Sequence, residues 1–543
     1  MKNKILYKSN SPIGELAAEH DETFLNSCFV SLPIIGDLLD VETSKCIILG
    51  RTGSGKTAIL NHIESTEENT IRVDPNNVAF DYIANSNVLL FLRHNGFDLR
   101  VLFVLLWKHV FLSQAIQVFF ENQSKFEFQL NKLFGNVNSD PAREYLDKYQ
   151  GKFWIEQDEI LREISGGFEE KVSAGIEGVI GTDFAKISSG LSNEIKIDAN
   201  QKSQISARVQ SAVSSLQFRL LQRAMETLNE LTTDKQKKYY ILVDDLDLDW
   251  APDQIKYDLI NALVDAVSSF RKVRKVKILA ALRTDLLERS NLEQVSDGFQ
   301  PEKNEGNFIK LLWSERDLKE VVDARINYLF KHKYTKQGVE FKHIFPSEVR
   351  KTTTFSYIFE RTQRRPRDII AFMNQILEKS AGTSEIIPKH ITDAESTYSS
   401  KRLDALYHEW KSVHPMLNVY LNLLKGKSGR IGFGDISERE FVFDLCVNIL
   451  DSSTVSTVID SVSTACNYYE KRENPSRRHD VVREYLAVLY KVGAIELKVQ
   501  ANEKAKSCYI DNASIASREI SDQSSFRINP MLWRALGITP NIG

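Results

Sequence analysis

One short segment near the N-terminus limits the folds open to this chain more than any other feature. It fits the pattern G-x-x-x-x-G-K-[ST], which binds phosphate where a strand precedes it and a helix follows. Residues 46–49 form an apolar run that predicts a buried strand, and residues 58–63 carry apolar side chains at helical spacing. We therefore expect a phosphate loop, and these flanks disfavour the alternative of a chance glycine-rich turn. The segment reads Gly50, Arg51, Thr52, Gly53, Ser54, Gly55, Lys56 and Thr57.

Each part of this segment has a chemical task in the expected loop. Glycines let backbone N–H groups turn toward phosphate oxygens, and the positive end of the following helix points at the same anion. We expect Lys56 to reach the β- and γ-phosphates of a nucleotide and Thr57 to offer its hydroxyl to Mg²⁺. The expected cofactors are therefore a nucleoside triphosphate and Mg²⁺.

The composition excludes several classes of protein. Five scattered cysteines without a C-x-x-C pair argue against a disulfide framework or a zinc site and favour a reducing cytosol. A net charge of −3 gives no global positive field to attract nucleic acid or an anionic membrane, although a local basic patch stays open. The most apolar run, 99–112, is too short to span a bilayer, and the N-terminus has no apolar stretch of signal-peptide length. We expect a cytoplasmic protein that does not bind membranes, with 99–112 as a buried helix.

The length of 543 residues is too great for one core, and four parts are expected. Residues 1–40 form an N-terminal segment that leads into a core at 41–305. A helical lid is expected at 306–400, and a winged-helix-like domain at 401–543. The boundaries follow the change from alternating strands and helices to a mainly helical pattern.

The expected core begins as a βαβ unit at 41–75 and resumes only with the apolar run at 239–243. The 77–235 stretch between them is too long for a simple crossover, so it is expected to be a mainly helical insertion. Within it, glycines break up 166–206, and 207–230 has the pattern of an amphipathic helix. Strands that alternate with helices predict an α/β fold, here a P-loop NTPase with a parallel doubly wound sheet.

Two carboxylates follow the apolar run at 239–243. Asp244 is expected to hold Mg²⁺, directly or through water, and Asp245 to polarise the attacking water. Sheets of this class bind ligands at the carboxyl ends of their strands, which is where both residues are expected. The alternative, a strand that ends in an acidic turn, is disfavoured by the phosphate loop upstream.

An arginine ends the next predicted strand, at 276–283. Arg283 and the adjacent Thr284 would lie at the same edge as the carboxylates, where a polar group can contact the γ-phosphate. A solvated loop arginine is the alternative interpretation.

Four arginines lie within eight residues of the expected lid. Their planar guanidinium groups suit phosphate, so they would close onto the nucleotide or reach the nucleotide of a neighbouring subunit. A solvated helix start, with Pro366 in the first turn and the arginines in surface ion pairs, is equally open. They are Arg361, Arg364, Arg365 and Arg367.

Helices followed by a small hairpin are expected near the C-terminal end. Residues 493–499 predict a strand, and 507–510 are its candidate hairpin partner. This succession is typical of a winged helix. If DNA is bound there, Arg477, Arg478 and His479 would contact its phosphate backbone.

These residues together resemble the STAND and AAA+ lineage of P-loop ATPases, and more closely an uncharacterised bacterial branch of it. In this resemblance Arg283 takes the sensor-1 position. Arg365 and Arg367 match the G-x-P-R-like segment of the lid, although Arg365 replaces the usual small residue. Asp245 stands where many AAA+ members have Glu, which implies slow hydrolysis. The resembling segments are CIILGRTGSGKTAIL, YYILVDDLD before Trp250, LLWSERDLKEVVDARI, RRPRDIIAFMNQ and INPMLWRALGI.

The resemblance implies an ATP-binding and ATP-hydrolysing molecular switch or oligomerising ATPase that uses Mg²⁺. It implies a homo-oligomer and a role in bacterial defence against phage. The sequence has no nuclease, protease, TIR-like or deaminase motif, so effector chemistry would belong to a partner protein. Two alternatives stay open: a DNA-associated ATPase that uses its winged helix, and a non-hydrolysing ATP-dependent scaffold for an effector.

Overall fold

The computed structural model divides into two units. The sheet unit comprises Pro33–Gly50 and Ile59–Lys310, and the helical unit comprises Met1–Leu32, Arg51–Ala58 and Leu311–Gly543. The structure describes residues 7, 11–75, 93, 97–121, 142, 145, 203, 216–232, 237–248, 250–251, 253–292, 304–333, 337–451, 461–471, 475–508 and 515–540.

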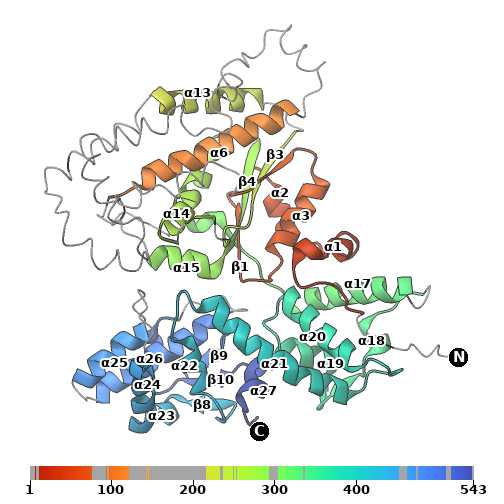
Figure 1. Ribbon diagram of the computed structural model, residues 1–543, viewed down its shortest axis with the longest axis vertical. Helices are drawn as coiled ribbons and strands as arrows, with labels where there is room; N and C mark the ends of the chain where they lie inside the picture. Colours follow the sequence, from red (N-terminus) through yellow and green to blue (C-terminus); the bar gives the residue numbers. More distant parts are fainter. Residues whose placement is uncertain are drawn as a thin grey trace, which may run out of the picture. The chain divides into compact units, whose positions relative to one another are not determined.

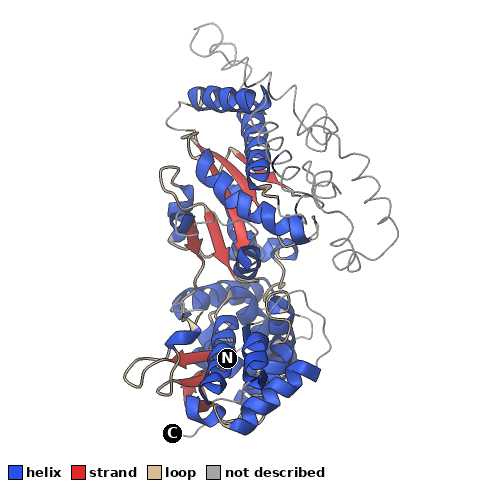
Figure 2. Cartoon of the chain, turned by 90° about the vertical axis from the view of Figure 1, so that its left-hand side faces the viewer, coloured by secondary structure: helices blue, strands red, loops and turns tan. Residues whose placement is uncertain are grey.

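A parallel sheet forms the centre of the sheet unit, as the apolar runs predict (Figure 2). Its strands are β1 (Ile47–Gly50), β2 (Thr70–Val73), β3 (Tyr239–Val243), β4 (Val276–Arg283) and β5 (Phe308–Lys310). The order is β2-β3-β4-β1-β5, and all four neighbouring pairs are parallel. Side chains of β1, β3 and β4 are buried almost throughout because helices cover both faces, whereas the edge strands β2 and β5 are only partly buried.

Helices cover both faces of this sheet. They are α2 (Ile34–Leu39), α3 (Lys56–Thr66), α6 (Arg100–Glu121), α13 (Leu216–Leu231), α14 (Asp253–Phe270) and α15 (Thr284–Leu292). Figure 1 shows α3 on one side of the sheet and α6, α14 and α15 on the other. The connection that leaves β1 runs toward β2, whereas those that leave β2, β3 and β4 cross the sheet in the opposite direction. Right-handed crossovers therefore place α3 on the face opposite the others.

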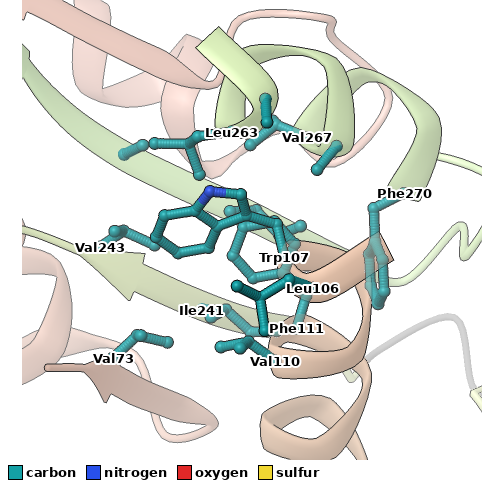
Figure 3. Packing of buried hydrophobic residues seen from close by; sticks show 14 of the residues in the cluster. Val73, Leu106, Trp107, Val110, Phe111, Ile241, Val243, Leu263, Val267 and Phe270 are labelled. Carbon is teal, nitrogen blue, oxygen red and sulfur yellow. The ribbon is translucent and has the colours of Figure 1, made fainter. Parts of the chain in front are cut away.

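Helix α6 supplies much of the apolar core of the sheet unit. It packs against α13, α14, β2 and β3. Trp107 is fully buried among Val243, Leu263 and Val267 (Figure 3), and its indole N–H donates to the carbonyl of Leu259 at 2.8 Å. By length and composition α6 could cross a membrane, but 72% of its most apolar window is buried. The prediction of a buried helix at 99–112 is confirmed.

The predicted insertion at 77–235 lies largely outside the described residues, including all of its glycine-rich part except residue 203. Where it is described, it is helical except at residues 97–99 and 232. The amphipathic helix expected at 207–230 is described from Leu216 onward as α13, with Leu221, Met225 and Leu228 buried on one side. That part of the prediction is confirmed.

The helical unit contains short strands beside its helices. The strands are β6 (Glu348–Val349), β7 (Thr352–Thr353), β8 (Arg430–Gly432), β9 (Ile495–Lys498) and β10 (Ser525–Ile528). The helices are α1 (Glu22–Cys28), α17 (Glu315–Lys333), α18 (Phe341–Ile344), α19 (Thr354–Glu360), α20 (Pro366–Lys379), α21 (Pro388–Trp410), α22 (Leu417–Asn422), α23 (Phe433–Ile436), α24 (Arg439–Asp451), α25 (Ser461–Lys471), α26 (Pro475–Val492) and α27 (Trp533–Leu536).

Helix α21 joins the two apolar cores of the helical unit. Its first half, with Ile391 and Tyr398, packs into a core shared with α17, α19 and α20. Its last turns, with Leu406 and Trp410, belong to the core that continues to Ile538. A rotation or shift of α21 would therefore disturb both cores.

The C-terminal core combines α24, α25 and α26 with a three-stranded antiparallel sheet of order β8-β10-β9. The strand predicted at 493–499 is confirmed as β9. Strand β9 pairs with β10, whose Phe526 and Ile528 are buried, and makes an isolated antiparallel bridge to Lys506. Of its candidate hairpin partner at 507–510, residues 509 and 510 lie outside the described residues, so that pairing stays a prediction.

Candidate functional site

The predicted phosphate loop lies between a strand and a helix, as its pattern requires. Gly50 ends β1, and α3 begins at Lys56. Gly53 and Gly55 have φ angles of +74° and +97°, which residues with a Cβ rarely adopt. The Nζ of Lys56 donates to the carbonyl of Arg51 at 3.1 Å, so this lysine reaches back over the loop.

The sheet has a switch point next to the strand that carries this loop. β1 and β4 are neighbours, with Gly50 opposite Arg283, and the connections that leave them run in opposite directions. Open parallel sheets bind ligands in the crevice at such a point, beyond the carboxyl ends of the strands. β3 ends beside β4, so Asp244 and Asp245 also emerge at this edge.

Asp244 is buried and lies in an ion pair within the sheet unit. The Nη1 of Arg72, on β2, is 3.4 Å from its Oδ2. Arg72 also contacts Asn61 at 2.6 Å and Glu64 at 2.9 Å, both on α3. Sequence patterns did not single out Arg72. The available signal was a charged residue inside a short predicted strand, but the structure was needed to show that this strand lies beside β3.

Asp245 has a left-handed backbone conformation with φ of 57°, which is uncommon outside glycine. Backbone strain of this kind accumulates at functional sites, where the surrounding structure holds it in place. The conformation marks Asp245 among the acidic residues that follow β3.

Arg283 lies between two carboxylates. Its guanidinium is 2.8 Å from Asp247 and 2.7 Å from Asp285. Burial alone would lower the pKa of Arg283, but the carboxylates of Asp285 and Asp247 raise it above the usual value. The guanidinium is thus a fixed positive charge held by ion pairs, and the alternative of a solvated loop arginine is wrong.

In the helical unit, the structure brings two of the predicted lid arginines to the loop. The backbone N–H of Arg367 donates to the carbonyl of Gly53 at 3.3 Å, and its Nε donates to the carbonyl of Leu16 at 2.8 Å. A Cβ on Gly53 would lie 2.6 Å from the Cβ of Arg367, so this close approach requires glycine. Arg365 precedes α20 as its N-cap residue and is buried.

Glu409, at the end of α21, accepts from both the loop and the lid. The Nε of Arg51 is 3.1 Å from Glu409 Oε1, and the Nη1 of Arg365 is 3.3 Å from the same oxygen. The guanidinium of Arg51 also lies over the ring of Trp410, 5.4 Å from its centroid. No local pattern could have predicted Glu409, because 358 residues separate it from Arg51.

The other two lid arginines are held away from the loop by carboxylates of their own. Arg361 is buried and pairs with Glu395 at 3.0 Å, and Arg364 pairs with Glu496 at 3.4 Å. The prediction of a helix start at Pro366 is confirmed. The alternative of solvated surface pairs is wrong for Arg361 and Arg365, since both are buried.

One comparison with known proteins gives a match. A family described as the FunZ-associated C-terminal helical domain matches residues 316–407, which run from α17 into the last turns of α21. A search of curated proteins found no match. The matched segment includes Arg365 and Arg367 but not the phosphate loop, so the resemblance to STAND and AAA+ ATPases stays a prediction.

Proposed function

We propose that the chain is a P-loop ATPase that binds ATP with Mg²⁺ and hydrolyses it slowly as a molecular switch. One observation carries the proposal: the Gly50–Thr57 pattern continues from a buried parallel strand into α3, at the switch point of the sheet. The FunZ-associated match is compatible with an ATPase of a defence system, which fits the role expected from the sequence.

The loop residues fit a triphosphate. Two glycines with positive φ provide the backbone turn, and the 11-residue α3 directs its N-terminus to the loop. Ser54 is 3% exposed, and its Oγ has no hydrogen-bond partner within the described residues. A phosphate oxygen is an acceptor that this hydroxyl could satisfy.

The residues also fit Mg²⁺. The described part of the chain holds no group of three or more His, Cys, Asp or Glu side chains placed for a metal ion. Mg²⁺ at a nucleotide uses few protein ligands, since waters and phosphate oxygens complete its shell. Thr57 and Asp244 would supply these protein contacts, and Mg²⁺ would neutralise charge on the phosphates.

The remaining roles fall to side chains at the sheet edge. Asp245 would polarise the attacking water, and Lys56 would stabilise negative charge on the β- and γ-phosphates. Arg283 would contact the γ-phosphate only after exchanging one of its two carboxylate partners. That exchange would let it respond to the presence of the γ-phosphate.

The test of the proposal is ATP binding and phosphate release by three variants. Lys56→Ala should weaken ATP binding by about 100-fold or more, because a charge-assisted phosphate contact is lost. Asp245→Asn should keep ATP binding and slow phosphate release. Lys389→Ala, an exposed lysine on α21, is the control and should behave as the wild type. Equal ATP affinity for wild type and Lys56→Ala would refute the nucleotide site.

Assembly is tested by light scattering on wild type and Asp245→Asn, with and without ATP–Mg²⁺. A mass that rises with ATP would support a homo-oligomer. If the mass rises with ATP while phosphate release is negligible, the result favours a non-hydrolysing scaffold for a partner effector over a hydrolysing switch.

A second candidate function is favoured by the C-terminal core. Helices α24–α26 beside a three-stranded antiparallel sheet make a winged-helix-like arrangement, which supports a DNA-associated ATPase. In that case binding to duplex DNA should fall steeply as salt rises, and Arg478→Ala should reduce the salt dependence. If the chain does not bind duplex DNA at low salt, the function as a DNA-associated ATPase is refuted.

A further inference from the structure

Within the helical unit, the segment from Leu311 onward contacts the phosphate loop through the carbonyl groups of the loop. The indole N–H of Trp313 donates to the carbonyl of Ser54 at 2.8 Å, and the backbone N–H of Arg367 donates to that of Gly53. In a phosphate loop the N–H groups turn toward the anion. A nucleotide would therefore bind the N–H groups of the loop, while Trp313 and Arg367 bind its carbonyl groups.

A buried cluster of ion pairs connects the loop to helices α20 and α21 of the same unit. Glu409 accepts from Arg51 of the loop and from Arg365. Arg365 in turn donates to Asp368 in the first turn of α20, which also accepts from Arg402 at 2.5 Å. The cluster thus joins the loop to α20 and then to the middle of α21.

Burial makes this cluster resistant to partial separation. The side chains of Glu409 and Arg365 are 5% and 6% exposed, and that of Asp368 is fully buried. Leaving one member unpaired in such surroundings is costly, because the charge keeps its desolvation penalty without its partner. A shift of Arg51 with the loop would therefore shift Glu409 and α21 as well, or break the pair altogether.

We propose that Glu409 is a positioning residue that transmits nucleotide occupancy of the loop to the helical domain. The inference rests on the proposed function, because it takes ATP as the ligand that moves or fixes the loop. Helix α21 contributes to both apolar cores of the helical unit, so it is the element through which the change reaches the C-terminal core.

The experiment is amide hydrogen exchange on the full chain, with and without ATP–Mg²⁺ at saturation. It follows residues 362–368, which include the Arg367 amide, and residues 406–412 around Glu409. Glu409→Gln keeps the size of the side chain and removes its charge. Glu320→Gln is the matched control, since it removes an exposed ion pair with Arg316 in the same unit.

In wild type and Glu320→Gln, ATP should change exchange in both segments by roughly tenfold, within the usual range of coupling between sites. In Glu409→Gln the ATP-induced change should fall at least about threefold while ATP still binds. A merely structural role would alter exchange without ATP but would leave the ATP-induced difference intact. An ATP-induced difference in Glu409→Gln equal to that of the wild type would overturn the proposal.

Two further outcomes are decisive. If the wild type binds no ATP, the proposed function and this inference both fail, whereas ATP binding with an unchanged response refutes the inference alone. If Glu409→Gln does not fold, Arg51→Gln takes its place. It leaves Glu409 paired with Arg365, and the same loss or retention of the ATP response then decides the question.

Discussion

The interiors of the two units differ in where charged side chains are buried. In the sheet unit the core consists of apolar side chains from β1, β3, β4 and the covering helices, with Trp107 near its centre. In the helical unit, carboxylates are buried beside the apolar cores: Asp368 is 0% exposed and Glu395 is 2% exposed. Both carboxylates are held by arginines. The first interior keeps its arginine-paired carboxylates, Asp244 and Asp285, at the carboxyl ends of β3 and β4, whereas the second places such pairs beside its apolar cores.

This difference affects what each unit tolerates. Loss of apolar volume costs the transfer free energy of the removed atoms plus the cavity that remains. Loss of one member of a buried ion pair leaves an unpaired charge, whose cost depends on pH. Substitutions that isolate each effect can therefore test the comparison.

The largest expected effect is in the sheet unit. Trp107→Ala should lower the free energy of unfolding by about 5 kcal/mol, because a fully buried indole and its hydrogen bond to Leu259 are lost. Urea unfolding followed by circular dichroism would measure it. Val101→Ala, on the exposed side of the same helix, should cost less than about 0.5 kcal/mol. A loss of under about 1 kcal/mol for Trp107→Ala would contradict the burial of Trp107 in this apolar core.

A somewhat smaller effect is expected in the helical unit. Asp368→Asn should cost about 4 kcal/mol at pH 7, since Arg365 and Arg402 lose their buried carboxylate. Asp393→Asn, exposed on α21, is the matched control for the same measurement.

The pKa of Asp368 determines how the stability of the helical unit changes with pH. Burial alone would raise the pKa of Asp368, but the guanidinium groups of Arg365 and Arg402 hold it well below the usual 3.8. The stability that its ionised form contributes is therefore present above about pH 4 and is lost as the pH falls further. The difference in the free energy of unfolding between wild type and Asp368→Asn should therefore narrow below about pH 4. A difference that stays constant would show that the charge of Asp368 does not cause the loss of stability.

Local patterns were sufficient to predict most of the sheet unit where it is described. The apolar runs before Gly50 and Asp244, and the run that ends at Arg283, predict β1, β3 and β4 because a strand buried on both faces is apolar throughout. The parallel sheet follows from their alternation with helices. The order of the strands could not be predicted, since no local feature records which strands become neighbours.

Partners that are distant in sequence explain what could not be predicted at the candidate site. The loop and the four lid arginines stand out locally, but their partners do not. Arg72 and Asp244 are 172 residues apart, and Trp313 lies 259 residues from Ser54. A glutamate at a helix end, such as Glu409, looks like any solvated residue until the fold places Arg51 beside it. Predicting the loop was possible from its pattern, whereas its contacts with Trp313, Arg367 and Glu409 required the structure.

The smallest expected effect concerns a titratable side chain inside the apolar core of the sheet unit. His109, on α6, is buried, and its Nδ1 lies 2.6 Å from the hydroxyl of Tyr145. Burial lowers the pKa of His109 from 6.5 to about 4, so the unfolded chain binds a proton between these values that the folded chain does not. Stability should therefore fall as pH drops through this window, by about 2.5 kcal/mol between pH 7 and pH 4.5. His109→Asn keeps a polar group for Tyr145 but does not titrate. Urea unfolding between pH 7 and pH 4.5 should show a shallower acid loss in this variant, and equal losses in the two proteins would show that His109 is not the cause.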